Sequence, residues 1–289
     1  MKKSLLSCMA MFACAGLMVN AEVNEPVLSL TFDQNGLVVG GTDAASASHA
    51  TRTFGTTMTY QNAMDGKWLG ATEYDGVFAV KYDSDDGVGQ AFKGSFTIEF
   101  LANIIYNMGY SYTPGKSEKG TGDLKIFSTQ QGGGWTFSRS TKYGMQFEIG
   151  FDKTPDDGTV NNTYYYAKCV YNETTGEDTR FFNLTGKYYQ HVAVYDAESH
   201  QIKYFVNGKL LFSSTIPNPA SFVFPSIGDV KREKGMDLFM GGDTGSQPTY
   251  IENGNRTVFV HANIYPSAMT DEEVAALYDT PEIKSYTEA

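Results

Sequence analysis

The stretch that most constrains the fold spans residues 188–214, where strand, turn and strand signals follow one another without a break. Residues 191–195 form a nearly continuous apolar run, and residues 202–206 follow with the period of two that half-buries a β-strand. Asn207 and Gly208 then separate this strand from a third apolar run. Both residue types tolerate the positive φ angles of a two-residue type I′ turn. The stretch therefore predicts a three-stranded antiparallel meander and an all-β protein.

The first 21 residues have the pattern of a secretory signal peptide. Lys2 and Lys3 precede a long uncharged stretch, and the small residues at 19–21 suit cleavage. We therefore expect an exported mature chain without a membrane span. An uncleaved membrane anchor is the alternative, although the apolar run is shorter than the ~18 residues that a spanning helix needs. Lipidation at Cys8 or Cys14 also stays open, because both lie in this segment.

Cysteine content and charge narrow the class of protein further. Cys169 is the one cysteine beyond the signal segment, so no intrachain disulfide can form and the hydrophobic core must hold the fold. The net charge of −11 becomes −13 once Lys2 and Lys3 are removed. An acidic protein repels the phosphate backbone, which argues against nucleic acid as a partner. The 19 tyrosines and 19 phenylalanines favour pleated sheets lined with aromatic side chains.

Strand-like segments recur along the rest of the chain, at 27–33, 74–82, 94–102, 124–127, 145–149, 163–171, 236–240 and 256–265. A helix is expected only at residues 271–278, where Thr270 as N-cap and Glu273 three positions later form a capping box. Neither a fixed-period repeat nor a linker interrupts the pattern. We expect one domain at residues 22–280, followed by a C-terminal tail at 281–289.

Several segments follow one another in an order that matches a known family, namely 30–33, 94–100, 188–194, 205–209, 238–242 and 262–274. Together they resemble the laminin-G-like domains of the concanavalin A-like lectin/glucanase superfamily, in the form common in secreted bacterial proteins. The last segment, a strand followed by a short helix, is the most specific. The resemblance covers nearly the whole mature chain and implies a jelly roll, an antiparallel β-sandwich of two sheets.

Two positions depart from the family pattern. Tyr188 or Tyr189 stands where relatives usually have tryptophan, and His261 stands where they usually have an acidic residue. In many relatives that acid and the one at the end of the first strand, here Asp33, help to hold a structural calcium ion. The resemblance therefore implies either no cofactor or one calcium ion with Asp33 among its ligands.

The sequence lacks the acid pattern of the enzymes in this superfamily, which are glycoside hydrolases with Glu-x-Asp-x-x-Glu along one strand. Glu99 and Glu148 occur singly in alternating strands, and we interpret both as outward, solvated carboxylates. His191 lies in a buried run, and we interpret it as a hydrogen-bonded core histidine. We expect no catalytic site. A glycoside hydrolase or lyase with an atypical acid site is the alternative.

Glycan binding needs exposed aromatic rings with hydrogen-bonding side chains nearby. The candidates are Tyr110 and Tyr112 in a glycine-rich loop, Trp135 after three glycines, Trp68, and Asp243 after two glycines. The alternative for either tryptophan is that it caps the core. We predict a non-catalytic domain that binds a glycan through loop aromatics in the periplasm, at the cell surface or outside a bacterium. A surface protein as partner, in a contact or assembly role, is the other alternative, and the oligomeric state is left open.

Overall fold

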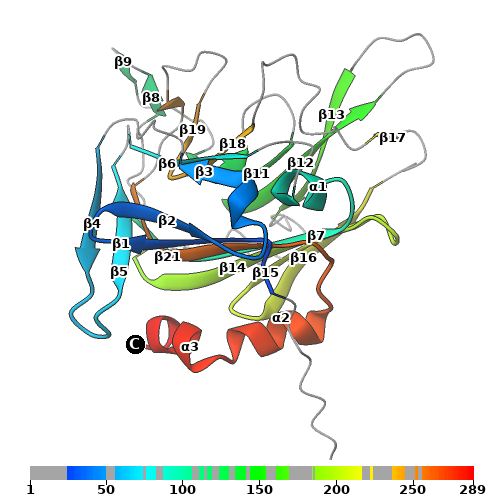
Figure 1. The fold of residues 1–289 in the computed structure, drawn as a ribbon. Coiled ribbons are helices and arrows are strands. Elements are labelled where there is room, and N and C mark those ends of the chain that lie inside the picture. The colour runs from blue at the N-terminus through cyan, green and yellow to red at the C-terminus, as the bar shows by residue number, and fades with distance from the viewer. Residues whose placement is uncertain are drawn as a thin grey trace, which may run out of the picture.

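The computed structural model of the chain describes residues 25–49, 56–73, 76–82, 87–105, 111–113, 116–118, 124–129, 134–140, 144–153, 161–168, 184, 186–216, 222–223, 236–244, 251–252 and 256–289. Within this part of the chain, two large antiparallel sheets face each other across an apolar core (Figure 1). The predicted antiparallel β-sandwich is confirmed. The expected signal segment, Cys169 and Tyr110 lie outside the described residues.

The first sheet has nine strands among the described residues and contains the predicted meander at one side. Its strand β21 (Arg256–Tyr265) pairs on one flank with β7 (Phe96–Ile105) and on the other with both β1 (Leu28–Asp33) and β5 (Trp68–Thr72). In spatial order the strands are β16 (Lys209–Thr215), β15 (Gln201–Val206), β14 (Tyr188–Asp196), β7 (Phe96–Ile105), β21 (Arg256–Tyr265), β1 (Leu28–Asp33) and β2 (Gly36–Gly40), with β5 (Trp68–Thr72) and β4 (Thr57–Gln61) branching from β21.

The second sheet has eight strands in the described part of the chain, and two short hairpins stand apart from it. Its strands in spatial order are β13 (Asn161–Lys168), β12 (Gly144–Lys153), β11 (Gly134–Ser140), β10 (Leu124–Thr129), β18 (Met236–Met240), β6 (Phe78–Tyr82) and β3 (Ala47–His49), with β17 (Phe222–Val223) beside β12. The short hairpins are β8 (Ser111–Thr113) with β9 (Lys116–Glu118), and β19 (Asp243–Thr244) with β20 (Ile251–Glu252). Short helices η1 (Ala44–Ser46) and α1 (Gly87–Ala91) lie in connections.

Aromatic rings fill the space between the two sheets. The Phe100 ring of the first sheet meets Phe137 of the second edge-on, with ring centroids 4.9 Å apart. The Phe127 ring meets Trp135 at the same separation of 4.9 Å. Aromatic pairs of this geometry add roughly 0.5–1.5 kcal/mol each beyond the area that they bury. The high aromatic content of the sequence therefore goes into the core.

The predicted meander forms with the predicted turn. Asn207 and Gly208 have φ angles of 48° and 70°, as a type I′ turn requires, and join β15 to β16. This turn also rests on a helix, because a Cβ atom built on Gly208 would lie 2.9 Å from the Cβ of Tyr278. Glycine is thus needed here both for its backbone conformation and for the close approach.

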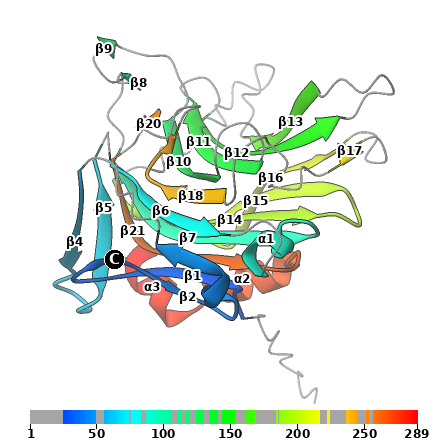
Figure 2. The same ribbon diagram turned by 45° about the horizontal axis from the view of Figure 1, so that its top comes forward.

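The C-terminal region covers the outer face of the first sheet (Figures 1 and 2). Helix α2 (Asp271–Tyr278) has the predicted bounds and capping box, in which Thr270 and Glu273 bond each other's backbone. Within the predicted tail, a second helix, α3 (Pro281–Thr287), follows α2 and buries Ile283 and Tyr286 against the sheet. Two apolar side chains three residues apart are too weak a sequence signal for a helix, which forms here because the sheet presents an apolar face to cover.

Candidate functional site

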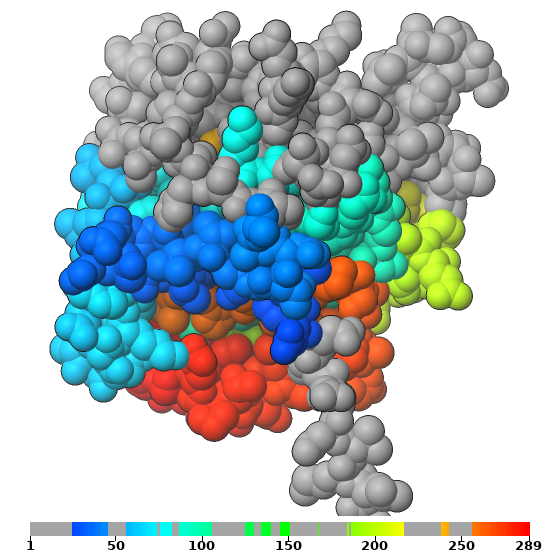
Figure 3. All heavy atoms as spheres, viewed as in Figure 1, coloured from blue at the N-terminus to red at the C-terminus, as the bar shows by residue number. Residues whose placement is uncertain are grey.

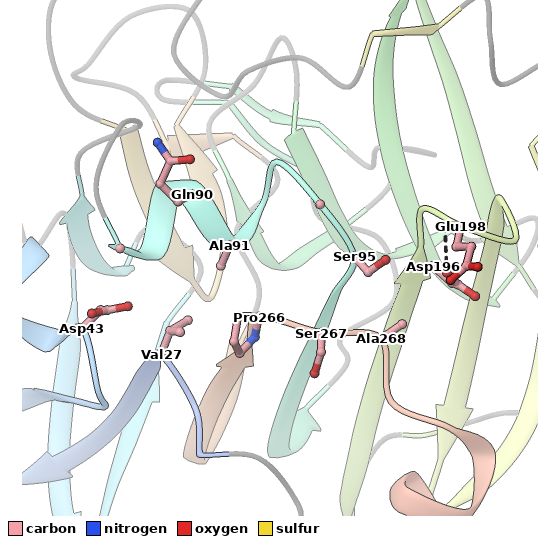
Figure 4. A pocket seen from close by; sticks show the side chains of 12 residues that line it. Val27, Asp43, Gln90, Ala91, Ser95, Asp196, Glu198, Pro266, Ser267 and Ala268 are labelled. Atoms are coloured by element: carbon pink, nitrogen blue, oxygen red, sulfur yellow. Dashed lines mark hydrogen bonds between the residues drawn. The ribbon is translucent and has the colours of Figure 1, made fainter.

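An open hollow of about 720 Å³ lies at the end of the first sheet where β7 begins and β14 and β21 end. Four connections meet there: the one after β2, helix α1 with the turn behind it, the β14–β15 turn, and the link from β21 to α2 (Figure 4). Its lining consists of Val27, Asp43, Gly87, Gln90, Ala91, Gly94, Ser95, Asp196, Glu198, Pro266, Ser267 and Ala268.

The polar lining of the hollow combines acidic, amide and hydroxyl groups. Asp43, Asp196 and Glu198 contribute carboxylates, Gln90 contributes an amide and Ser95 a hydroxyl. No cationic side chain and no aromatic ring is among the described residues that line it. Carboxylates accept hydrogen bonds only, whereas the amide both donates and accepts. The lining therefore suits a ligand rich in hydroxyl groups and without negative charge.

The β14–β15 turn is held in place by two sets of hydrogen bonds. The backbone N–H of Ala197 donates to the Ser95 hydroxyl at 2.9 Å, which ties the turn to the start of β7. Within the turn, the Ser199 hydroxyl and the Glu198 backbone N–H both donate to the Asp196 carboxylate, at 2.5 and 2.9 Å. The bond from Ser199 lowers the pKa of Asp196 despite its partial burial, so this carboxylate is charged at neutral pH. The exposed Glu198 side chain thus stands on a fixed turn.

A second polar cluster lies on the outer face of the first sheet, beneath α3. Glu99 of β7 is fully buried, and its Oε1 lies 3.0 Å from Nε2 of His261 on β21. Its Oε2 accepts a hydrogen bond of 2.9 Å from the Asn263 amide. Burial lowers the pKa of His261, but the charge of Glu99 and the bond to it outweigh burial and raise that pKa above its ordinary value. The buried Glu99 carboxylate thus favours the protonated form of His261 under the helix.

Polar contacts also fix α3 above this cluster. Glu282 of α3 accepts a bond from Lys67, in the loop between β4 and β5, and the Tyr286 hydroxyl donates to Asp65 of the same loop. The Nδ1 atom of His261 lies 4.0 Å from Oε1 of Glu282. The helix is thus bound both to the hairpin loop and to the buried pair.

The interpretation of Glu99 as a solvated carboxylate was wrong. The side chain does face away from the sandwich core, as the strand alternation predicts, but it is fully buried there, on the face against which α3 packs. Glu148 is half-buried on β12, beside Thr136 and Tyr166 of the neighbouring strands. Buried beneath the helix, Glu99 cannot reach a polysaccharide from its present position, which removes it as a catalytic acid in this structure.

His191 has the structural role expected of it. Its ring is fully buried, stacks on Phe100 with centroids 4.7 Å apart, and places Nδ1 2.7 Å from the Tyr204 hydroxyl. Burial lowers the pKa of His191 to about 3, so the ring is neutral. The interpretation as a hydrogen-bonded core histidine is confirmed.

The structure does not bring the predicted binding residues together. Trp135 is only 1% exposed and packs in the core, so its prediction as a platform for a sugar ring was wrong. Trp68 is half-buried on β5 and packs against the same core. Tyr112 and Asp243 belong to β8 and β19, and their side chains lie outside the described part of the structure, as Tyr110 does entirely.

The expected calcium ligand Asp33 lies at the end of β1, where its Oδ1 accepts a 2.6 Å bond from the Asn35 backbone N–H. Among the described residues, no group of three or more His, Cys, Asp or Glu side chains is placed to hold a metal ion. Calcium takes six to eight oxygen ligands, and one carboxylate bonded within its own turn fits such a site poorly. The structural calcium stays a prediction.

Sequence reasoning missed the hollow because its residues come from distant segments. Asp196 was visible as the end of an apolar run, and Glu198 lies in the following turn. Nothing local links them to Asp43 or Gln90, which the sheet topology brings to the same end of the sandwich.

No protein-family model matches the sequence, and no curated protein matches it either. Solved structures are similar in fold. The binding domain of botulinum neurotoxin DC in complex with SialylT is 14% identical, with a TM-score of 0.54 over 88% of this chain and 51% of the other. The serotype C1 binding domain is 13% identical, with a TM-score of 0.55 over 88% and 51%. The binding domain of neurotoxin DC in complex with rat synaptotagmin II is 14% identical, with a TM-score of 0.51 over the same shares.

The chain spans about half the length of these solved binding domains. At such low identity the likeness shows the fold alone, which is a β-sandwich. Membership in the laminin-G-like family stays a prediction. No helix in the described part of the chain is both long and apolar enough to cross a membrane.

Proposed function

We propose that this chain is an exported, non-catalytic binding domain that recognises a glycan in the hollow beside the β14–β15 turn. The observation that carries the proposal is the lining of carboxylate, amide and hydroxyl groups around a turn fixed by the Ser95–Ala197 bond. The similar solved domains lend support to a binding role alone, since each is described as a binding domain. The site differs from the predicted aromatic platforms, because Trp135 is buried.

The chemistry of the lining narrows the class of glycan. Sugar hydroxyls donate to carboxylates, and Glu198 is an exposed carboxylate with no other bonding partner among the described residues. Asp43 and Asp196 add negative charge with no cation in the described lining. Sialic and uronic acids would meet like charge, so a neutral or amino sugar fits better.

The test is a glycan array followed by calorimetry on residues 22–289. Removing the charge of a carboxylate that accepts a sugar hydroxyl costs about 1.5–3 kcal/mol, so Glu198→Gln should weaken binding roughly 10- to 150-fold. Glu288→Gln, the same change at an exposed position near the C-terminus, is the matched control and should bind as the unmodified domain does. No binding to any neutral or amino glycan, or equal affinities of Glu198→Gln and Glu288→Gln, would refute the proposed site.

The protein-contact alternative is supported by one similar binding domain, which is described in complex with rat synaptotagmin II. For this chain the alternative predicts that the domain retains a surface protein and that Glu198→Gln does not change this retention. The enzymatic alternative rests on Glu148, which is half-buried but not enclosed. Turnover of a polysaccharide panel that Glu148→Gln abolishes would establish it and overturn the binding-only proposal.

Export and calcium are also proposals. Export rests on residues 1–21, and a mature N-terminus at residue 22, measured by mass spectrometry, would support it. The calcium expectation rests on Asp33, and calorimetric titration of the metal-free domain tests it directly. Heat that Asp33→Asn removes would support a calcium site there.

A further inference from the structure

Exposed apolar side chains gather on the β4–β5 hairpin. In Figure 3 this hairpin, in light blue and cyan, lies at one rim of the molecule. Among the described residues, five large apolar side chains are exposed, and three of them belong to this hairpin: Met58 at 55%, Tyr60 at 38% and Met64 at 71%. Met58 and Tyr60 are two residues apart on one strand and so share a face. Their cross-strand partners Ala71 and Leu69 pack in the apolar layer beneath α3. The pair therefore continues that layer to the surface, where the Tyr60 hydroxyl is hydrogen-bonded to Tyr188.

Among the described residues, strand β4 is also an edge of the first sheet. Within the described part of the chain it is hydrogen-bonded to β5 alone. Natural edge strands are usually protected by charged side chains, proline or a bulge, because their free backbone groups can pair with another strand. The five residues of β4, TMTYQ, include neither a charged side chain nor a proline, and their register with β5 has no bulge.

The backbone bonds at both ends of the hairpin show which groups face outward. Asn62 N–H donates to the Lys67 carbonyl, and Glu73 N–H donates to the Thr56 carbonyl. Bonded pairs alternate along an antiparallel ladder, so the even-numbered residues of β4 bond β5. The odd-numbered residues, Thr57, Thr59 and Gln61, consequently direct their N–H and C=O groups to the free edge.

This free edge is self-complementary. If two copies pair antiparallel with Thr59 on the twofold axis, Thr59 faces its own copy and Thr57 faces Gln61 of the second copy, all with outward backbone groups. Met58 then lies opposite Tyr60 of the second copy in a non-hydrogen-bonded pair, where side chains are closest. Thioether and aromatic ring attract each other in such contacts. In this one register, the outward backbone N–H and C=O groups are hydrogen-bonded and both exposed side chains are covered.

We propose that a second copy of this chain binds through β4, extending the first sheet across a twofold axis at Thr59. The acidic net charge, −13 without Lys2 and Lys3 (−11 − 2), opposes association at long range, but the hairpin carries little of it. Its loop charges Asp65 and Lys67 are both engaged by α3, through Tyr286 and Glu282. The contact is a small one, so the dimer is concentration-dependent, and salt that screens the net charge strengthens it.

Sedimentation equilibrium of residues 22–289, from low micromolar to several hundred micromolar, tests the pairing. Thr59→Pro removes an outward N–H while leaving the β4–β5 bonds in place, and Met58→Glu puts a charge opposite Tyr60 of the second copy. Each should raise the dissociation constant at least about tenfold. Met64→Glu, a matched change at the hairpin tip outside the ladder, should leave the constant unchanged.

Melting temperatures of the variants establish whether each is folded. If Thr59→Pro does not fold, Met58→Glu still tests the pairing. A single monomeric mass at all concentrations and salt levels would overturn the proposal. So would a dimer that survives Met58→Glu, or one that Met64→Glu disrupts to the same extent.

Discussion

The buried pair under α3 gives the sharpest prediction about stability. His261→Ala removes the partner of Glu99 Oε1 and leaves a fully buried carboxylate with the Asn263 amide at 2.9 Å and the Gln190 amide at 3.5 Å. Breaking a buried ion pair by removing one partner costs about 3–5 kcal/mol, because the remaining charge is uncompensated. For a chain of this size, 1 kcal/mol lowers the melting temperature by roughly 2–4 °C. We therefore expect a decrease of roughly 6–20 °C, measured by calorimetry at pH 6.

A double variant that lacks both members of the pair tests whether the loss of stability comes from the unpaired charge. With Glu99→Gln added, no charge is buried, so the double variant should recover at least about 1 kcal/mol relative to the sum of the single losses. His200→Asn, in the β14–β15 turn, is the control, because asparagine tolerates the φ of 56° there and His200 is half-exposed. Its melting temperature should stay within about 2 °C.

The pH dependence has a definite sign. The folded-state pKa of His261 is raised, so the stability that its charge contributes is fully present below its ordinary pKa and is lost as pH rises through the folded value. As the pH rises above 6.5, the ordinary pKa of histidine, the unmodified domain should lose stability and His261→Ala should lose less. Equal slopes in the two proteins, or a melting temperature unchanged by His261→Ala at pH 6, would refute the reasoning about the pair.

Three further predictions concern named contacts. Gly208→Ala should cost about 1–3 kcal/mol in chemical denaturation, because φ is 70° and the new Cβ would meet Tyr278 at 2.9 Å. Trp135→Ala should cost about 3–5 kcal/mol in the same assay without changing glycan affinity, whereas a large loss of affinity with unchanged stability would return this tryptophan to the binding site. Tyr286→Phe removes the bond to Asp65 and should cost about 1 kcal/mol of stability. Faster hydrogen exchange confined to α3 would show that the stability is lost in this helix.

Features set by local physical chemistry were predictable from the sequence. The Asn207-Gly208 turn and the capping box of α2 each depend on a few neighbouring residues, and both form as expected. The apolar run around His191 likewise predicted a buried strand. Alternation and capping act over a few residues, which is the range that a sequence pattern reports.

Features that depend on distant segments were not predictable. Whether Glu99 is solvated depends on α3, which lies far along the chain. The sequence signals of this helix, Pro281 at its start and the apolar pair Ile283 and Tyr286, do not show where it packs. The strand alternation placed Glu99 on the outer face and could say nothing of what covers that face. Trp135 follows three glycines, which suggested a loop, yet it lies within β11 and points into the core.

The most direct test of the account is a crystal structure of residues 22–289 with a neutral or amino oligosaccharide selected on a glycan array. The account predicts the sugar in the hollow, with its hydroxyl groups within hydrogen-bonding distance of Gln90 and Glu198. A sugar bound elsewhere, for example against Tyr112 or Trp68, with the hollow left to solvent, would contradict it.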